Sequence, residues 1–181
     1  YMPEFMAAVL SADMQNTDKI VRLVEECGNR KLTLLPPDVN RSVFSFTVSD
    51  QGDVIYGLGA IKGLGEGPVE AIVATRKEGG NFISLFDFCS RVDGKKLNKR
   101  ALDALIRSGA MDSIGPDGEV GFRRAVMLAA MTEAVKTAEQ QARNSISGMT
   151  DLFGGDSLDL SAESRYKSFN DVPCETPKER L

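Results

Sequence analysis

The sequence predicts a mainly α-helical fold of the α+β class, in which helices surround one small β element and a flexible acidic tail follows. In several stretches, apolar residues recur at helical spacing between capping residues and glycines, which is typical of helices. Between residues 31 and 56, short apolar or alternating runs are separated by prolines and a polar turn, which indicates strands. Beyond residue 144 the chain is rich in Ser, Gly, Asp and Glu, a composition that favours disorder.

The composition limits both the number of domains and the chemistry. The 181 residues, 42% of them hydrophobic, suffice for one ordinary domain or for one compact domain with an extension. There is no histidine, which excludes a Ser-His-Asp triad, a Cys-His pair and a His-containing zinc site within this chain. The cysteines are odd in number and far apart in sequence, so a disulfide framework is not expected.

No segment indicates a membrane span or an export signal. The longest uninterrupted apolar run, residues 125–131, is far shorter than a membrane span, and the first residues form no basic targeting segment. We therefore expect a cytoplasmic protein without a membrane partner. Tyr rather than Met at position 1 indicates a segment of a longer polypeptide.

Residues 1–56 are expected to form one unit, a helical hairpin followed by the small β element. Residues 4–10 are strong helix formers and largely apolar. Asn16 is suited to cap a second helix, which Gly28 would end. No group of side chains suited to acid-base catalysis occurs in this unit. The expected strands are residues 31–35, which two prolines end, 43–48 and, after a turn, 54–56.

Glycine is concentrated between residues 57 and 67, with five in eleven residues, so the backbone there adopts positive φ angles or approaches another segment closely. The dinucleotide fingerprint GxGxxG fails because Pro68 stands where its third glycine is needed, and no GxxxxGK[ST] occurs. A short apolar helix, a turn at residues 62–65 and a second helix fit the pattern. Two helices joined by Gly-hydrophobic-Gly resemble the helix-hairpin-helix module of DNA repair and replication proteins, although Lys62 stands where proline is usual.

This motif predicts contacts with the DNA backbone. Free N–H groups at the start of the second helix point outward at a phosphate oxygen, and glycines let the backbone come close. Such contacts read phosphates, so binding would be independent of base sequence and sensitive to salt. A tight corner between two helices without a ligand is the alternative. The candidate DNA-binding residues here are Lys62, Gly63, Leu64, Gly65, Arg76 and Lys77.

A second group of candidate DNA contacts lies around a helix start. Ser84 and Asn98 are suited to cap two successive helices, the second of which Gly109 would end. Residues around Asn98 are basic although the helix dipole favours negative charge there, which an approaching phosphate would explain. The net charge is −4 overall but +2 between residues 57 and 124. A solvated basic helix start is the alternative. The candidates are Lys95, Lys96, Lys99 and Arg100.

The end of the chain is expected to carry a docking motif. An alanine-rich face at helical spacing predicts one long helix over residues 120–143. We therefore place a DNA-binding domain at residues 57–143 and a flexible linker at residues 144–181. Within the linker, an apolar pentamer bracketed by glycines has the form of a short linear docking motif, with folding back of its apolar residues onto the domain as the alternative. The pentamer consists of Met149, Thr150, Asp151, Leu152 and Phe153.

Taken together, these stretches resemble the family of bacterial DNA polymerase III alpha subunits, the replicative polymerases. The resemblance implies that residues 1–56 are the distal part of the fingers and residues 57–143 the helix-hairpin-helix region. It also implies that residues 144–181 are the linker that binds the β sliding clamp through the pentamer. The stretches that carry the resemblance are residues 3–8, 13–19, 35–40, 56–63, 85–89 and 104–110.

The resemblance further implies a part in DNA replication, within a DNA-directed DNA polymerase. Its partners would be duplex DNA, the clamp and other subunits of the polymerase holoenzyme. The family's catalytic aspartates, which hold two Mg²⁺ ions, belong to a palm domain upstream, and nothing here matches them. We therefore expect no catalytic residue, metal ligand or cofactor site in this chain, and no polymerase activity from it alone. The family's clamp motif usually begins with glutamine, where Met149 stands here.

Other assignments remain open. One is a stand-alone helix-hairpin-helix adaptor of repair or recombination, and another is an error-prone sister polymerase of the same family. The β element before the glycine-rich stretch favours the polymerase over the adaptor, and the clamp-like pentamer favours the replicative form. An enzyme that uses only carboxylates and lysines is less well supported, because no suitable pairing of them is found.

Overall fold

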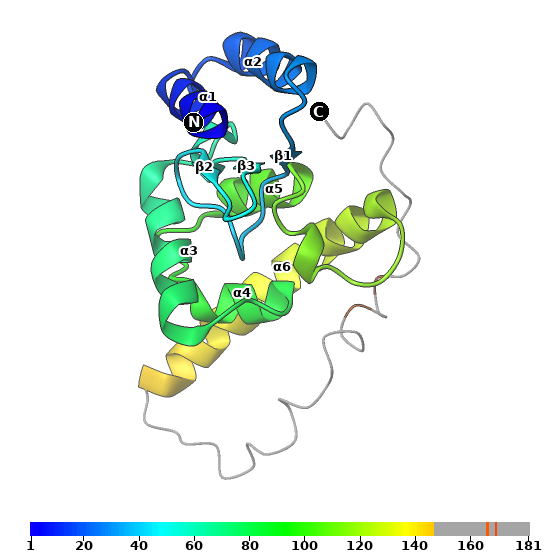
Figure 1. Ribbon diagram of the computed structural model, residues 1–181. Coiled ribbons are helices and arrows are strands. Elements are labelled where there is room, and N and C mark those ends of the chain that lie inside the picture. Colours follow the sequence, from blue (N-terminus) through cyan, green and yellow to red (C-terminus); the bar gives the residue numbers. More distant parts are fainter. Residues whose placement is uncertain (147–165, 167–168, 170–181) are drawn as a thin grey trace.

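The computed structural model describes residues 1–146 together with Tyr166 and Phe169. It confirms a mainly helical fold with one small sheet (Figure 1). The buried residues form two separate hydrophobic clusters, by which we divide the described part of the chain into two units. The N-terminal unit holds α1, α2 and the sheet, and the C-terminal unit holds α3 to α6. None of the helices described is long and apolar enough to cross a membrane.

The predicted helical hairpin is confirmed as α1 (Met2–Ala12) and α2 (Thr17–Asn29). The side chain of Asn16 accepts a hydrogen bond from the Lys19 N–H at 3.1 Å, as expected of a capping residue. The expected end at Gly28 is wrong, because α2 continues past it and Lys31 takes the left-handed conformation with φ of 56°. Leu32 then donates its N–H to the Cys27 carbonyl at 2.9 Å and packs against the N-terminal cluster. A non-glycine residue loses roughly 1–2 kcal/mol in this conformation, and the hydrogen bond and partial burial of Leu32 act against that cost.

The sheet is smaller than predicted. Its strands are β1 (Leu34–Leu35), β2 (Thr47–Val48) and β3 (Val54–Ile55). The predicted hairpin is confirmed, since β2 pairs antiparallel with β3, whereas β1 pairs parallel on the other side of β3. The first predicted strand begins only at Leu34, because Lys31 still belongs to the turn that follows α2. The second begins only at Thr47, because Val43 and Phe44 bond to Leu58 and Gly59 instead of to the sheet.

The C-terminal unit is built on its last helix. The long helix α6 packs along α4 and α5, and α3 runs toward the end of α4 (Figure 1). The caps predicted at Ser84 and Asn98 are confirmed by hydrogen bonds of 3.0 and 2.8 Å, and Gly109 has φ of 86° after the second helix. The elements are η1 (Leu58–Ala60), α3 (Glu66–Gly79), α4 (Leu85–Arg91), α5 (Lys99–Arg107), η2 (Asp112–Ile114) and α6 (Val120–Ile146).

Two glycines allow a close crossing of backbones where the chain enters the C-terminal unit. A Cβ on Gly57 would lie 2.7 Å from the Phe44 carbonyl oxygen, and one on Gly59 would lie 2.7 Å from the Phe44 ring. Leu58 donates its N–H to the Val43 carbonyl at 2.8 Å across this crossing. The glycines at these positions therefore serve packing and not a ligand.

We expect Gly57→Ala to lower the free energy of unfolding by about 2–3 kcal/mol, because the added methyl meets backbone that cannot move aside. Urea denaturation followed by circular dichroism measures the change. The matched control is Gly67→Ala in α3, where nothing lies within 4 Å of the added atom. That substitution should leave the protein as stable or slightly more stable, since alanine favours a helix. Equal effects of the two substitutions would contradict the crossing.

Two described residues beyond α6, Tyr166 and Phe169, belong to the C-terminal cluster. Helix α6 extends to Ile146, and Tyr166 is only 2% exposed within the C-terminal cluster. The Leu85 N–H at the start of α4 donates to the Tyr166 hydroxyl at 2.8 Å, and the ring lies 5.7 Å from that of Phe86. Burial raises the pKa of the Tyr166 phenol to about 12. Phe169 packs against the same cluster.

We expect Tyr166→Phe to cost about 1–3 kcal/mol of stability, because the buried Leu85 N–H would lose its acceptor. Urea denaturation gives the difference, and hydrogen exchange at Leu85 reports the lost bond directly. Tyr1→Phe is the control, since Tyr1 is fully exposed. Unchanged exchange at Leu85 in the Tyr166 variant would show that the hydroxyl does not bind there.

Candidate nucleic-acid interface

The predicted turn lies between η1 and α3. Gly63 has φ of 90°, the left-handed conformation that favours glycine. Gly65 is the N-cap of α3 and offers no side chain to the first N–H groups of that helix. These donors are thus available to an oxygen from outside. Leu64 is 5% exposed and packs in the core, so its side chain holds the turn in place.

The prediction for the first helix of the pair is wrong in length. Instead of a short α-helix, a single 3₁₀ turn, η1, precedes the turn. The reason is the backbone crossing described above, because Leu58 and Gly59 donate their N–H groups to carbonyls of Val43 and Phe44. The second helix, α3, forms as predicted.

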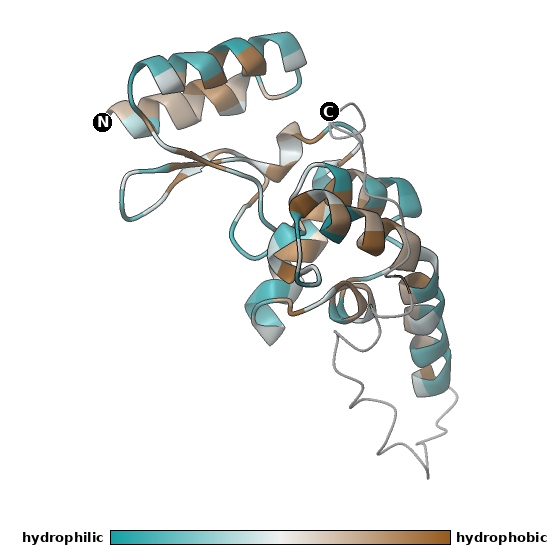
Figure 2. Cartoon of the chain, turned by 90° about the vertical axis from the view of Figure 1, so that its right-hand side faces the viewer, coloured by the Kyte–Doolittle hydropathy of each residue, from teal (hydrophilic) through white to brown (hydrophobic). Residues whose placement is uncertain are grey.

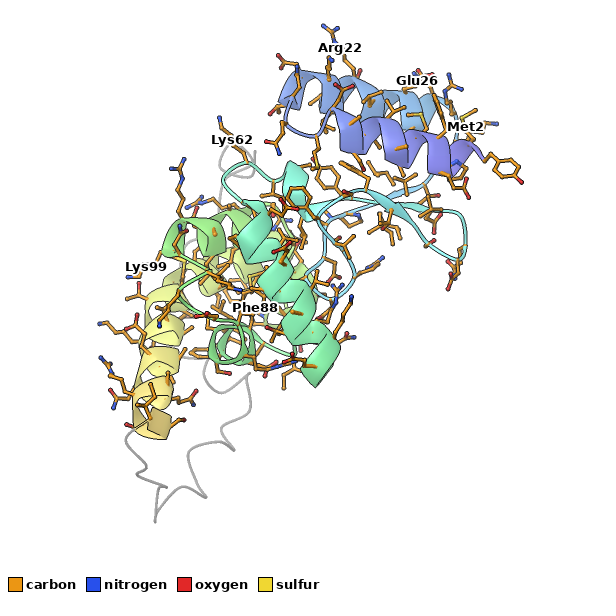
Figure 3. The ribbon with its side chains drawn as sticks, turned by 90° about the vertical axis from the view of Figure 1, so that its left-hand side faces the viewer. Met2, Arg22, Glu26, Lys62, Phe88 and Lys99 are labelled. Atoms are coloured by element: carbon orange, nitrogen blue, oxygen red, sulfur yellow. The ribbon has the colours of Figure 1, made fainter. Side chains whose placement is uncertain are left out.

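A second element brings positive charge beside this turn. Asn98 caps α5 and places Lys99 and Arg100 in its first turn. The Nε atom of Arg100 lies 3.9 Å from the position that a Cβ on Gly63 would take, so the two elements are neighbours. Lys62 and Lys99 lie along the same side of the molecule (Figure 3).

The loop before α5 extends the charged surface. Lys95 donates its N–H to the Asp93 carboxylate at 2.9 Å, and Leu97 is buried, which fixes the loop backbone. The side chains of Lys95 and Lys96 are exposed. We call the resulting surface the basic ridge, and its five residues are Lys62, Lys95, Lys96, Lys99 and Arg100.

The positively charged side chains of the basic ridge differ from several arginines of the same unit in whether they pair with acidic side chains. Within the described part of the chain, none of the five side chains makes an ion pair or a side-chain hydrogen bond. Arg91, Arg107 and Arg124 instead pair with aspartates at 3.1, 2.9 and 2.6 Å. The exposed Glu66 in the first turn of α3 is an acidic neighbour that reduces the local potential. The arrangement suits an anionic backbone that brings its own negative charge.

Two of the predicted DNA contacts lie apart from the ridge. Arg76 and Lys77 stand in the last turn of α3, about 16 Å along the helix axis from Gly65. The Arg76 guanidinium donates to the carbonyls of Val39 and Ser42 at 2.8 and 3.0 Å. Burial lowers the pKa of Arg76, which nevertheless stays charged. Arg76 thus serves the fold, and Lys77 remains an exposed cation outside the ridge.

Two points remain, the location of the predicted clamp-binding pentamer and the search for a metal site. The pentamer Met149, Thr150, Asp151, Leu152 and Phe153 lies outside the described residues. Within the part that the structure describes, no group of three or more His, Cys, Asp or Glu side chains could hold a metal ion.

Sequence comparisons agree with this description. A family model described as "Helix-hairpin-helix motif" matches residues 31–119, which include the turn, α3 and the basic ridge. The chain is 56% identical to DNA polymerase III subunit alpha of Pseudomonas aeruginosa over 98% of its length, which is 16% of that relative. It is 48% identical to the same subunit of Vibrio cholerae over 100% of its length and 50% identical to that of Escherichia coli over 85%. The chain thus spans about one sixth of these relatives.

Proposed function

This chain belongs to the DNA polymerase III alpha subunit family, and we propose that it holds the backbone of duplex DNA for a replicative DNA polymerase. We propose nucleotidyl transfer only for the whole polymerase. The relatives are about six times longer than this chain. Further proposed partners are the β sliding clamp and other subunits of the holoenzyme, and the proposed location is the cytoplasm. The helix-hairpin-helix match over residues 31–119 supports DNA as the ligand.

The observation that carries this proposal is the basic ridge. Five exposed cations, none paired within the described residues, lie in the turn before α3, in the loop before α5 and in the first turn of α5. One of them, Arg100, lies beside Gly63, close to the free N–H groups at the start of α3. Phosphates are the ligand that this combination suits, because a cation and a helix N-terminus both attract negative charge. The free N–H groups of the helix start and the charged side chains of the ridge both suit phosphate oxygens, so we propose that the contact is mainly with the DNA backbone.

A second element of the proposal concerns the clamp. The pentamer from Met149 to Phe153 would dock on the sliding clamp through Leu152 and Phe153, with Asp151 before them as in the family's motif. Burying the two apolar side chains contributes roughly 2 kcal/mol each, so docking alone is weak. DNA held by the same chain raises the effective concentration of the clamp that encircles it, which makes a weak contact useful.

Two alternatives are less well supported. A stand-alone adaptor of repair or recombination would share the helix-hairpin-helix motif, but the identity to polymerase subunits extends over nearly the whole chain. An error-prone sister polymerase would share the fold, but the relatives named above are all called DNA polymerase III subunit alpha.

A titration of two duplexes of unrelated sequence tests the proposed contact. Fluorescence anisotropy should give dissociation constants for this chain that agree within about twofold, because phosphates are common to both sequences. A strong preference for one sequence would contradict backbone recognition. Failure to bind either duplex at low salt would contradict the basic ridge as a DNA contact.

A further inference from the structure

A short loop connects the two units, and it is not part of the proposed DNA contact. Residues 38–42 leave the N-terminal sheet after β1, enter the C-terminal unit and return to β2. Val39 is fully buried, and it belongs to the hydrophobic cluster of the C-terminal unit, whereas Leu34 before it and Phe46 after it belong to the other cluster. We call residues 38–42 the peg.

The backbone of the peg is bonded to two elements of the C-terminal unit. Val39 donates its N–H to the Ala110 carbonyl, just after α5, at 2.8 Å. Arg76, in the last turn of α3, donates from one nitrogen to the carbonyls of both Val39 and Ser42 at 2.8 and 3.0 Å. A guanidinium between two carbonyls holds the loop from the α3 side, while Ala110 holds it from the α5 side.

The side chains of the peg add two further connections. Asn40 forms a two-point contact with the backbone of Phe82, which donates its N–H at 2.7 Å and accepts from the amide at 2.9 Å. Asp38 is nearly buried and accepts from the Ser113 hydroxyl at 3.1 Å and from the Asn40 N–H at 2.7 Å. These bonds connect the loop to three separate segments of the C-terminal unit, which favours one arrangement of it.

Apart from these loops, the two units make few contacts with each other. The helices and strands of the N-terminal unit make their principal contacts with one another, and those of the C-terminal unit do the same. Figure 2 shows α1 and α2 standing apart from the helices of the C-terminal unit, with loops between them. The orientation of one unit relative to the other therefore depends on the peg and on the crossing at Gly57 and Gly59.

We propose that the peg locks the two units into one rigid body, with Arg76 and Asn40 as positioning residues. A movement of the N-terminal unit is then transmitted to the basic ridge instead of being absorbed by a hinge. The lock itself is independent of DNA, whereas its consequence for the duplex rests on the proposed function.

Distances between two spin labels test the lock. One label is placed on α2 with Arg22→Cys and the other on α6 with Glu133→Cys, both at exposed positions. Cys174→Ser removes a third reactive thiol, while Cys27 and Cys89 are buried, and burial raises the pKa of Cys89 to about 12. Pulsed electron resonance on the whole chain should give a single narrow distance distribution.

The decisive variant is Asn40→Ala with Arg76→Ala, measured where circular dichroism shows native helix content. We expect loss of the single narrow distribution, because two of the connections to the C-terminal unit are removed. Lys77→Ala is the matched control, since it removes the neighbouring cation of α3, which contacts no part of the peg, and its distribution should stay narrow. Should the double variant fail to fold, Arg76→Ala alone is measured by the same criterion, and Arg76→Lys should restore part of the narrow population.

A broad distribution in the unsubstituted chain, or a distribution that stays narrow without Asn40 and Arg76, would overturn the lock. These outcomes are distinct from failure of the proposed function, which is read from duplex titration of the unsubstituted chain.

Discussion

Lys99→Glu combined with Arg100→Glu weakens the binding of duplex DNA by about 100-fold at low salt, or about 2.7 kcal/mol. Both side chains belong to the first turn of α5, and Arg100 lies beside Gly63. The substitution removes two attractive charges and adds two repulsive ones next to phosphates, in the middle of the basic ridge. Anisotropy titration of a labelled duplex measures the loss.

A control separates this local effect from the change in net charge. Lys19→Glu with Arg22→Glu alters the net charge equally, but on α2, in the other unit (Figure 3). We expect a several-fold smaller loss from this pair, because screening limits exposed charges to about 10 Å. Equal losses from the two pairs would mean that the ridge has no special part in binding. Unfolding midpoints of both variants show whether either substitution disturbs the fold.

Leu152→Ala with Phe153→Ala abolishes binding to a bacterial β sliding clamp. The two side chains supply roughly 4 kcal/mol of transfer free energy, about a thousandfold in affinity, which takes a micromolar contact beyond the range of calorimetry. The measurement is made without DNA, so that the duplex contact cannot conceal the loss. Leu158→Ala with Leu160→Ala is the control, since it removes two apolar side chains from the same segment outside the motif. Unchanged affinity of the Leu152 and Phe153 variant would remove the docking proposal.

The sequence correctly predicted the helix caps, the end of α5 and the β-hairpin, because each depends on residues that are close in sequence. Asn16, Ser84 and Asn98 cap helices as expected, because a cap needs only its own side chain and an N–H about three residues on. Gly109 ends α5 for a similarly local reason. The hairpin of β2 and β3 follows from its turn, in which Gly52 has φ of 85°.

Long-range packing decided what the sequence could not predict. Lys31 rather than Gly28 takes the left-handed conformation, and Leu32 after it bonds back to Cys27 and packs against the N-terminal cluster. The crossing of backbones reduces a predicted helix to η1. Arg76 was a reasonable phosphate contact by sequence, but the peg that it holds is 34 to 37 residues away and leaves no local trace.

The positive charges of the candidate site could be predicted from the sequence, but the proximity of the two segments that form it could not. Four cations between residues 95 and 100 are plain in the sequence, as are the glycines of the turn. Their neighbourhood, in which Arg100 lies beside Gly63, results from the packing of α3 and α5 in one hydrophobic cluster. No periodicity or motif indicates a contact between segments so far apart.

The most direct test of the central claim, that the basic ridge holds duplex DNA by its phosphates, is the salt dependence of binding. Dissociation constants of the unsubstituted chain are measured by anisotropy from about 50 to 300 mM potassium chloride. Five cations near phosphates predict a slope of about −4 for the logarithm of the association constant against that of salt concentration, and about −2 to −3 after Lys99→Glu with Arg100→Glu. A slope near zero, or the same slope in both proteins, would contradict the account.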